Sequence, residues 1–231
     1  LNVLYMDLRT LIIGRIYSPS MLGYYNRGRQ FPQVIVSNID GSIQSVMLPT
    51  LASQQDNRQR VKEMMRRAIV SSSFLIFPMM IGMAVVAGPL VRVVLTDKWL
   101  PAVPFLQIFC LSYALMPIHT ANLQAINALG RSDIFLKLEI VKKITGLIIL
   151  AISLPFGVHA IAMGQVVSGI ISTFINAFPN KKLLDYSYVE QWKDIVPSLL
   201  IAVLMGFVVY LFNFAGLIAW QQLILQVVVG V

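Results

Sequence analysis

Six polar side chains recur at helical spacing within the otherwise apolar stretch 23–51. Successive members lie 4, 3, 4, 3 and 4 residues apart, which places all six on one face of a helix. They are Asn26, Gln30, Gln33, Ser37, Asp40 and Gln44. In lipid, such a face must turn toward other helices or toward water. Hydrogen bonding between helices, at about 0.6 kcal/mol per bond, is one interpretation. The number of polar positions favours the other, a water-filled cavity that binds a polar ligand.

Charged residues inside the apolar segments are mostly cationic. The cations are Arg9, Arg15, Arg27, Arg29, Lys142 and Lys143, and the acids are Asp7, Asp40 and Glu139. Charges at membrane depth are expected to be paired or hydrated, and Glu139 with Lys143 has the i,i+4 spacing of an ion pair. A cationic cavity suits an anionic amphiphile, because arginine binds phosphate through two parallel hydrogen bonds. For Lys142 and Lys143, snorkelling or a cytoplasmic helix extension is an equally open interpretation.

These residues define a predicted binding site and two candidates for ion coupling. The site comprises the six-residue polar face together with Arg15, Arg27, Arg29, Gln124 and Lys143. Asp40 or Glu139 could carry a coupling proton or sodium ion, although an acid neutralised by an arginine neighbour would be only a structural partner. No catalytic residues, metal or cofactor are expected, because the sequence holds no phosphate-binding glycine loop, nucleophile motif or metal-ligand cluster.

The elements that position these residues are predicted to be membrane-spanning helices. Of 231 residues, 57% are hydrophobic and 12% are charged, and the mean hydropathy is +0.75. A soluble domain carries about 25% charged residues, so most of this surface must face lipid. Runs such as 144–154 and 195–212 do not alternate polar and apolar residues, which excludes barrel strands. The predicted fold class is therefore an all-α integral membrane protein, a polytopic helical bundle.

About eight segments have the roughly 20 apolar residues that a spanning helix needs. Gly88-Pro89 is predicted to end the third span, Gly130 the fourth, and Pro155-Phe156-Gly157 the fifth. The predicted spans are 1–17, 23–51, 68–88, 103–128, 134–155, 158–179, 195–213 and 216–231.

The distribution of Lys and Arg predicts the orientation of these spans. The loops at 53–67, 129–133 and 180–194 hold nine of the 18 Lys and Arg residues, more than the alternate set of loops holds, which places them in the cytoplasm. Most of the net charge of +8 follows from this bias. Nucleic acid binding is not expected, because no basic face is interleaved with exposed aromatic residues.

Three stretches resemble a known family. Residues 16–30 (IYSPSMLGYYNRGRQ), 100–106 (LPAVPFL) and 122–133 (NLQAINALGRSD) are similar to the polysaccharide flippases of the MOP superfamily. These are Wzx-like exporters of undecaprenyl-pyrophosphate-linked sugar repeats, in the lipopolysaccharide and exopolysaccharide branch. The resemblance implies a fourteen-helix protein of two six-helix lobes plus two further helices. Residues 1–179 would be the second lobe and 180–231 the additional pair. Both ends lie in apolar runs, so we expect the C-terminal part of a longer protein.

The resemblance implies a flippase of the bacterial inner membrane rather than an enzyme. It would work by alternating access, with a polyprenyl-pyrophosphate-linked oligosaccharide as substrate, membrane lipid around it, and a polysaccharide polymerase and export machinery as partners. One alternative is a membrane enzyme, such as a polymerase or lipid-linked glycosyltransferase, which should carry a large external loop or a carboxylate-rich site. A drug or cation antiporter of the superfamily would favour an acidic cavity. A scaffold subunit would not need a polar face.

Overall fold

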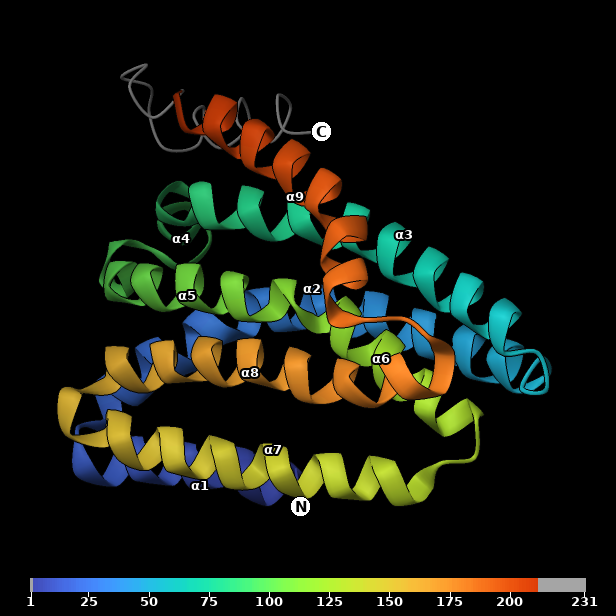
Figure 1. Cartoon of the computed structure of the whole chain (residues 1–231). Helices are drawn as coiled ribbons and strands as arrows, with labels where there is room; N and C mark the ends of the chain where they lie inside the picture. Colours follow the sequence, from blue (N-terminus) through green and yellow to red (C-terminus); the bar gives the residue numbers. More distant parts are fainter. Residues whose placement is uncertain (1, 212–231) are drawn as a thin grey trace.

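The chain is all-helical throughout the part that the computed structural model describes. That part is residues 2–211, with side chains described from residue 9 onward (Figure 1). The predicted span 216–231 therefore lies outside the described residues, as does the side chain of Asp7. The elements are α1 (Asn2–Ile16), α2 (Pro19–Ala52), α3 (Arg58–Val85), α4 (Ala87–Leu95), η1 (Asp97–Ala102), α5 (Val103–Ala114), α6 (Met116–Ala128), α7 (Ser132–Ser153), η2 (Leu154–Phe156), α8 (Val158–Leu184) and α9 (Tyr188–Leu211).

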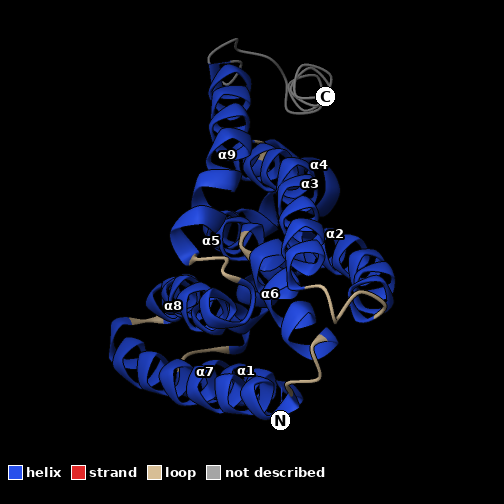
Figure 2. Cartoon of the chain, turned by 45° about the vertical axis from the view of Figure 1, so that its right-hand side comes forward, coloured by secondary structure: helices blue, strands red, loops and turns tan. Residues whose placement is uncertain are grey.

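The long helices form a layered bundle. In Figures 1 and 2, α1 and α7 lie together along one side, next to α8, and α9 runs beside α3 on the opposite side. Four segments of the described chain are long and apolar enough to cross a membrane: Arg58–Val85, Asp97–Ala128, Val158–Leu184 and Tyr188–Leu211. By that measure α2 and α7 are too polar and α1 is too short, so composition alone identifies fewer spans than the eight predicted.

The three basic loops lie at the same end of the bundle. Figure 1 shows the α2–α3, α6–α7 and α8–α9 connections at one end, and the α1–α2, α3–α4 and α7–α8 connections at the other. This arrangement is what alternating spans require. The assignment of the basic end to the cytoplasm stays a prediction.

Near three prolines, the observed helix boundaries differ from the predicted ones. The predicted span 103–128 is broken at Leu115 into α5 and α6, because Pro117 in the first turn of α6 has no N–H to continue the ladder. α3 ends at Val85, and Gly88-Pro89 lies in the first turn of α4, where proline is tolerated. Pro179 is accommodated inside α8, which continues to Leu184. The proposed boundary between residues 179 and 180 therefore falls within a helix, although the division into a lobe and an extra pair stays a prediction.

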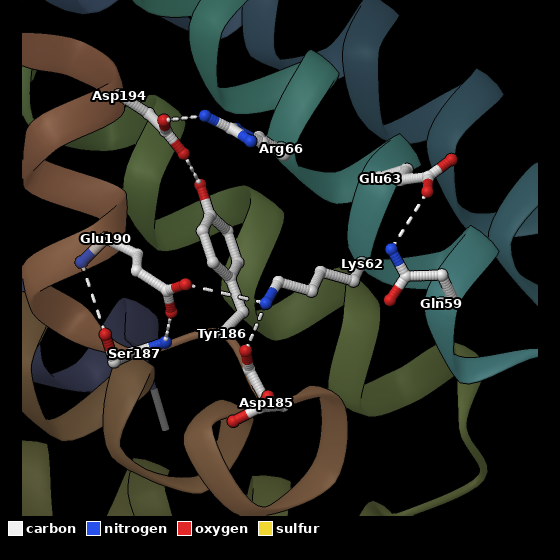
Figure 3. Close-up of polar contacts among 9 residues, drawn as sticks. All are labelled: Gln59, Lys62, Glu63, Arg66, Asp185, Tyr186, Ser187, Glu190 and Asp194. Carbon is white, nitrogen blue, oxygen red and sulfur yellow. Dashed lines mark hydrogen bonds and ion pairs between the residues drawn. The ribbon is translucent and has the colours of Figure 1, made fainter.

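A group of polar contacts fixes the start of α9 against the start of α3 (Figure 3). Ser187 and Glu190 form a reciprocal cap: the Ser187 N–H donates to Glu190 at 2.7 Å, and the Glu190 N–H donates to the Ser187 hydroxyl at 3.2 Å. Arg66 pairs with Asp194 at 2.5 Å, and the Tyr186 hydroxyl donates to the other Asp194 oxygen at 2.7 Å. The Lys62 ammonium donates to the backbone carbonyl of Asp185. These bonds fix the direction in which α9 leaves α8.

Three buried amides connect α6, α8 and α9 just inside this end. Asn122 donates to Gln191 at 2.8 Å, and its carbonyl oxygen accepts from Asn180 at 2.7 Å and from Gln191 at 3.1 Å. All three side chains are buried. Buried polar groups of this kind persist where partners satisfy one another, so this cluster fixes how α9 packs on the rest of the bundle.

Candidate functional site

The orientation of α2 is set by its start and by its contact with α5. Ser18 caps the helix, its hydroxyl accepting from the Met21 N–H at 3.2 Å, and Pro19 occupies the first turn. Gly28 lies directly against α5, since a Cβ there would stand 2.6 Å from the Phe105 Cβ and 2.7 Å from the Leu106 nitrogen. This close approach buries one face of α2 and directs the opposite, polar face away from the core.

That polar face lines a pocket of about 630 Å³, here called the α2 pocket. Its lining comes from α1, α2 and η1, and polar groups predominate. The lining residues are Thr10, Gly23, Asn26, Arg27, Arg29, Gln30, Gln33, Val34, Ser37 and Trp99. Four of the six residues of the predicted polar face and two of the predicted arginines are therefore brought together in one pocket.

Arg27 is the best-positioned cation of the α2 pocket. Its guanidinium donates to Gln30 at 2.8 Å and lies 5.4 Å from the centre of the Trp99 ring. Trp99 is itself braced edge-on by Tyr24, with the ring centres 5.9 Å apart. These contacts hold the planar guanidinium in place while leaving the side chain exposed. A cation fixed in this way can bind a phosphate or carboxylate with a defined orientation.

Asp40 and Gln44 depart from the predicted face. Asp40 is 6% exposed and does not line the α2 pocket. Its carboxylate accepts from Gln44 at 2.8 Å, and the Gln44 carbonyl accepts from Gln124 of α6 at 3.1 Å. The prediction that all six residues line one cavity is wrong for these two: their spacing keeps them on the stripe, but the contact of Gln44 with Gln124 places this end of the stripe against α6 rather than in the α2 pocket. Gln124 likewise serves this helix contact rather than the pocket.

One further prediction about this region is corrected, and one apolar residue joins the site. Val34 is 52% exposed and lines the α2 pocket beside the polar residues. Arg15 was expected to join the site, but it lies exposed at the end of α1 and is not among the lining residues. The polar stripe is bordered closely by apolar positions, so its edges are poorly defined by spacing alone.

Glu139 and Lys143 lie in a separate pocket of about 290 Å³, here called the α7 pocket. Glu139 forms an ion pair with Lys142, at i+3. Arg9 of α1 also lines this pocket and donates to Gln165 of α8 at 2.8 Å. Five of the six cations predicted as one group are therefore divided between two pockets that share no lining residue.

Sequence reasoning missed several residues that build the two pockets. Trp99 was not among the predicted site residues, yet it packs on Arg27. Gln165 accepts from both Arg9 and Tyr25, at 2.8 and 3.2 Å, and had no distinguishing pattern in the sequence. Its isolated polar position in an apolar helix was the available signal. Within the described residues, no group of three or more His, Cys, Asp or Glu side chains could hold a metal ion.

Comparison with solved structures shows the fold that the bundle adopts. The structure titled "Lipid II flippase MurJ, inward closed conformation" superposes with a TM-score of 0.77 at 18% sequence identity. The match covers 96% of this chain and 50% of that chain. The bundle thus has a MurJ-like transporter fold, and the predicted fold class is confirmed.

Sequence comparisons match the chain to polysaccharide biosynthesis proteins. Residues 1–104 match the family described as "Polysaccharide biosynthesis protein". "Lipopolysaccharide biosynthesis protein WzxC" of Escherichia coli (strain K12) is 26% identical over 219 residues, covering 90% of this chain and 44% of that protein. "Teichuronic acid biosynthesis protein TuaB" of Bacillus subtilis (strain 168) is 26% identical over 133 residues, covering 58% and 28%. "Uncharacterized membrane protein in cps region" of Klebsiella pneumoniae is 25% identical over 179 residues, covering 77% and 37%.

The predicted resemblance to the Wzx-like polysaccharide flippases of the MOP superfamily is therefore confirmed, and the chain is a multi-pass membrane protein. It spans less than half the length of the curated relatives that it matches.

Proposed function

We propose that this chain forms the second lobe of a flippase that moves polyprenyl-pyrophosphate-linked oligosaccharides across the bacterial inner membrane. The α2 pocket is the observation that carries the proposal. It presents two arginines and five uncharged polar side chains, and among the side chains that the structure describes no acidic residue lines it. Asn and Gln amides suit sugar hydroxyls, and arginine suits phosphate. The names of the relatives, with lipopolysaccharide and teichuronic acid biosynthesis, point to the same class of substrate.

The charge of the pocket favours this function over cation antiport. An antiporter for cationic drugs needs acids that face its ligand, whereas Asp40, the acid on the polar stripe of α2, is buried away from the α2 pocket. Asp40 remains a candidate for ion coupling. Its carboxylate is bonded by Gln44, but one of its oxygens is buried and has no hydrogen-bond partner among the described residues.

In the proposed mechanism, the pyrophosphate and sugar headgroup enters the pocket while the polyprenyl tail stays in lipid. Arg27 binds the phosphate oxygens, and the Asn and Gln amides along α2 form hydrogen bonds with the sugar hydroxyls. Rocking of this lobe against a partner lobe then exposes the headgroup to either side of the membrane in turn. Polysaccharide polymerase and export proteins would receive the product on the outer side.

Substitution of Arg27 in the full-length flippase tests the proposal. We expect Arg27→Lys to reduce surface polysaccharide in a flippase-deleted strain, since lysine acts as a point charge and loses the second phosphate bond. Arg27→Ala should reduce it further, by about tenfold or more in transport rate if one charge-assisted bond is lost. Lys98→Ala is the matched control, because Lys98 is an exposed cation next to Trp99 that does not line the pocket. Wild-type polysaccharide levels in both Arg27 variants, at equal protein levels, would contradict the proposal.

A further inference from the structure

An apolar groove lies between α2 and α3, next to the connection that joins them at the basic end of the bundle (Figure 1). Its walls come from residues 39–51 of α2 and 64–75 of α3, and we call it the α2–α3 groove. It has a volume of about 600 Å³ and shares no lining residue with the α2 pocket. On α3 the wall residues recur at spacings of 4, 3 and 4, which places them on one face: Met64, Ala68, Ser71 and Leu75.

The α2–α3 groove offers hydrocarbon rather than hydrogen bonds to an occupant. Three of its four hydroxyl side chains donate to backbone carbonyls of their own helices, at 2.9, 2.6 and 2.5 Å; they are Ser42, Thr50 and Ser72. The remaining wall is formed by Ile, Val, Leu, Met and Ala side chains together with Ser71. In a membrane protein, such a surface suits an alkyl chain.

The length of the groove matches the thickness of one membrane leaflet. From Met64 to Leu75, α3 rises about 17 Å at 1.5 Å per residue. Half of the hydrocarbon core of a bilayer is about 15 Å thick. Arg67 is the last charged residue of α3, and residues 68–85 carry no charge. The groove therefore begins where charged side chains give way to apolar ones, which is the level of a lipid headgroup.

Two arginines lie at this charged end of the groove. A smaller pocket of about 220 Å³, here called the α3 pocket, is lined by Arg60, Arg67, Gln54, Glu63 and Met64. Met64 also lines the α2–α3 groove, so the two features adjoin at this residue. Arg60 donates to the neutral Gln54 amide at 3.1 Å, and both arginines are exposed.

The α3 pocket has complementary charge for a phosphate. Glu63 is the one acid that lines it among the described residues, so two arginines against one carboxylate leave one positive charge. The neighbouring cations Lys62 and Arg66 are directed instead to Glu190 and Asp194, at 3.6 and 2.5 Å (Figure 3). A volume of about 220 Å³ is below the usual range of small-molecule sites, which suits a phosphate rather than an oligosaccharide.

We propose that the α2–α3 groove and the α3 pocket together bind an anionic membrane phospholipid, with an acyl chain in the groove and the phosphate at Arg60 and Arg67. Arginine binds phosphate through parallel hydrogen bonds, and basic pockets between membrane helices take anionic headgroups. An apolar protein segment would fill the groove but would not supply the charge that the arginines complement. This inference does not rest on the function proposed for the α2 pocket.

Quenching of a fluorophore in the groove tests the proposal in the full-length protein. Leu75→Cys, in a background without other reactive cysteines, is labelled with a small fluorophore and reconstituted into phosphatidylcholine nanodiscs. We expect phosphatidylglycerol with brominated acyl chains to quench it to saturation at a low lipid fraction, and brominated phosphatidylcholine to quench weakly at that fraction. Ile148→Cys is the matched control, because Ile148 is exposed outside the groove, about as far along α7 from its basic end as Leu75 is along α3.

Substitution of Arg67 tests the headgroup contact. Arg67→Gln should raise the fraction of brominated phosphatidylglycerol for half-quenching about fivefold, the contribution of one arginine near anionic lipid. Arg58→Gln is the matched control, because it removes the same charge from an exposed position of α3 that lines neither the groove nor the α3 pocket. We expect it to leave the half-quenching fraction unchanged.

Four results would overturn the proposal. Equal quenching at Leu75 and Ile148, or by the two phospholipids, would show contact with bulk lipid alone. Quenching by neither phospholipid would show that a protein segment covers the groove. Relief of quenching by a stoichiometric amount of the lipid-linked repeat unit would assign the groove to that lipid. Equal shifts in Arg67→Gln and Arg58→Gln would remove the phosphate from the α3 pocket. Because the readout is phospholipid binding, a negative result for Arg27 in transport leaves this test intact.

Discussion

Arg27 shows how neighbouring side chains can fix the orientation of an arginine in a membrane protein. A free arginine at a helix end would sample many rotamers and anchor the helix through charge alone. Here Gln30 and Trp99 engage the guanidinium together. The sequence identified Arg27 from its place beside the polar stripe, but not Trp99, which comes from a different element. Residue type and spacing therefore indicated the Arg27 guanidinium, and only the folded structure shows that Trp99 orients it.

Gly28 gives the sharpest prediction at the level of single residues. A methyl group at this position would overlap α5, standing 2.6 Å from the Phe105 Cβ and 2.7 Å from backbone nitrogen. Gly28→Ala should therefore push α2 from α5 and destabilise the protein by about 1–3 kcal/mol, lowering the melting temperature of the detergent-solubilised full-length protein.

Gly41→Ala is the matched control for Gly28. It lies on the same helix, and nothing would lie within 4 Å of its Cβ. Because alanine favours a helix over glycine by about 1 kcal/mol, this variant should be neutral or stabilised. Equal melting temperatures for the two variants would mean that the close contact between α2 and α5 does not set the orientation of the polar face.

Hydrophobic runs predicted most of the elements, and the errors have common physical causes. Gly130 and Gly157 were placed correctly at breaks, and both adopt the positive φ that glycine allows, 69° and 96°. The break at Leu115 was missed, because an apolar run with one proline does not distinguish a kink from a tolerated proline. Along α2, the stripe residues from Asn26 to Ser37 line one pocket. Beyond them, Gln44 bonds Asp40 and contacts Gln124 of α6, a contact between helices that spacing within one helix does not contain.

Charge pairing within helices was predicted less well than helix positions. Helical spacing allows ion pairs at both i+3 and i+4, so Lys142 and Lys143 were both possible partners of Glu139. The structure shows the ion pair with Lys142. The division of the cations into two pockets depends on how α1 and α7 pack, which no local pattern encodes. The amide cluster of Asn122, Asn180 and Gln191 was missed for the same reason, since its members come from three helices.

The connection between α8 and α9 carries a prediction about pH. The Tyr186 hydroxyl donates to Asp194, and burial together with this bond raises the pKa of Tyr186 above its usual value of 10.0. Tyr186→Phe should lower the free energy of unfolding by about 1 kcal/mol. Because the folded pKa is raised, the contribution of Tyr186 is complete below pH 10 and is lost only as the pH rises through the folded pKa.

Melting curves of the wild-type protein and Tyr186→Phe between pH 7 and about pH 10 check this prediction. The difference in melting temperature should stay constant over that range. Tyr188→Phe is the control, because the Tyr188 ring stacks on Phe174 and phenylalanine keeps that contact. A difference that vanishes well below pH 10 would show that Tyr186 is not buried against Asp194.

At the scale of the whole molecule, the two pockets lie in different parts of the bundle. The α2 pocket is lined from α1, α2 and η1, and the α7 pocket is lined from α1, α5, α6, α7 and α8. α1 contributes Thr10 to one and Arg9 to the other. A rocking motion that displaced α1 would therefore affect both pockets. The contacts of α9 with α3 and of Asn122 with Gln191 keep α9 attached to the lobe in such a motion.

Occupation of the α2 pocket by substrate is the central claim, and substrate-dependent labelling of Ser37→Cys tests it most directly. The full-length variant, in a Cys110→Ala background, is labelled with a water-soluble thiol reagent in membranes from two strains. One strain makes the lipid-linked repeat unit, and the other lacks the transferase that begins its synthesis. Leu48→Cys is the control, because Leu48 is exposed on α2 but does not line the pocket. We predict that Ser37→Cys reacts readily without the repeat unit and several-fold more slowly with it, while Leu48→Cys reacts equally in both. Equal labelling of Ser37→Cys in the two strains would contradict the account.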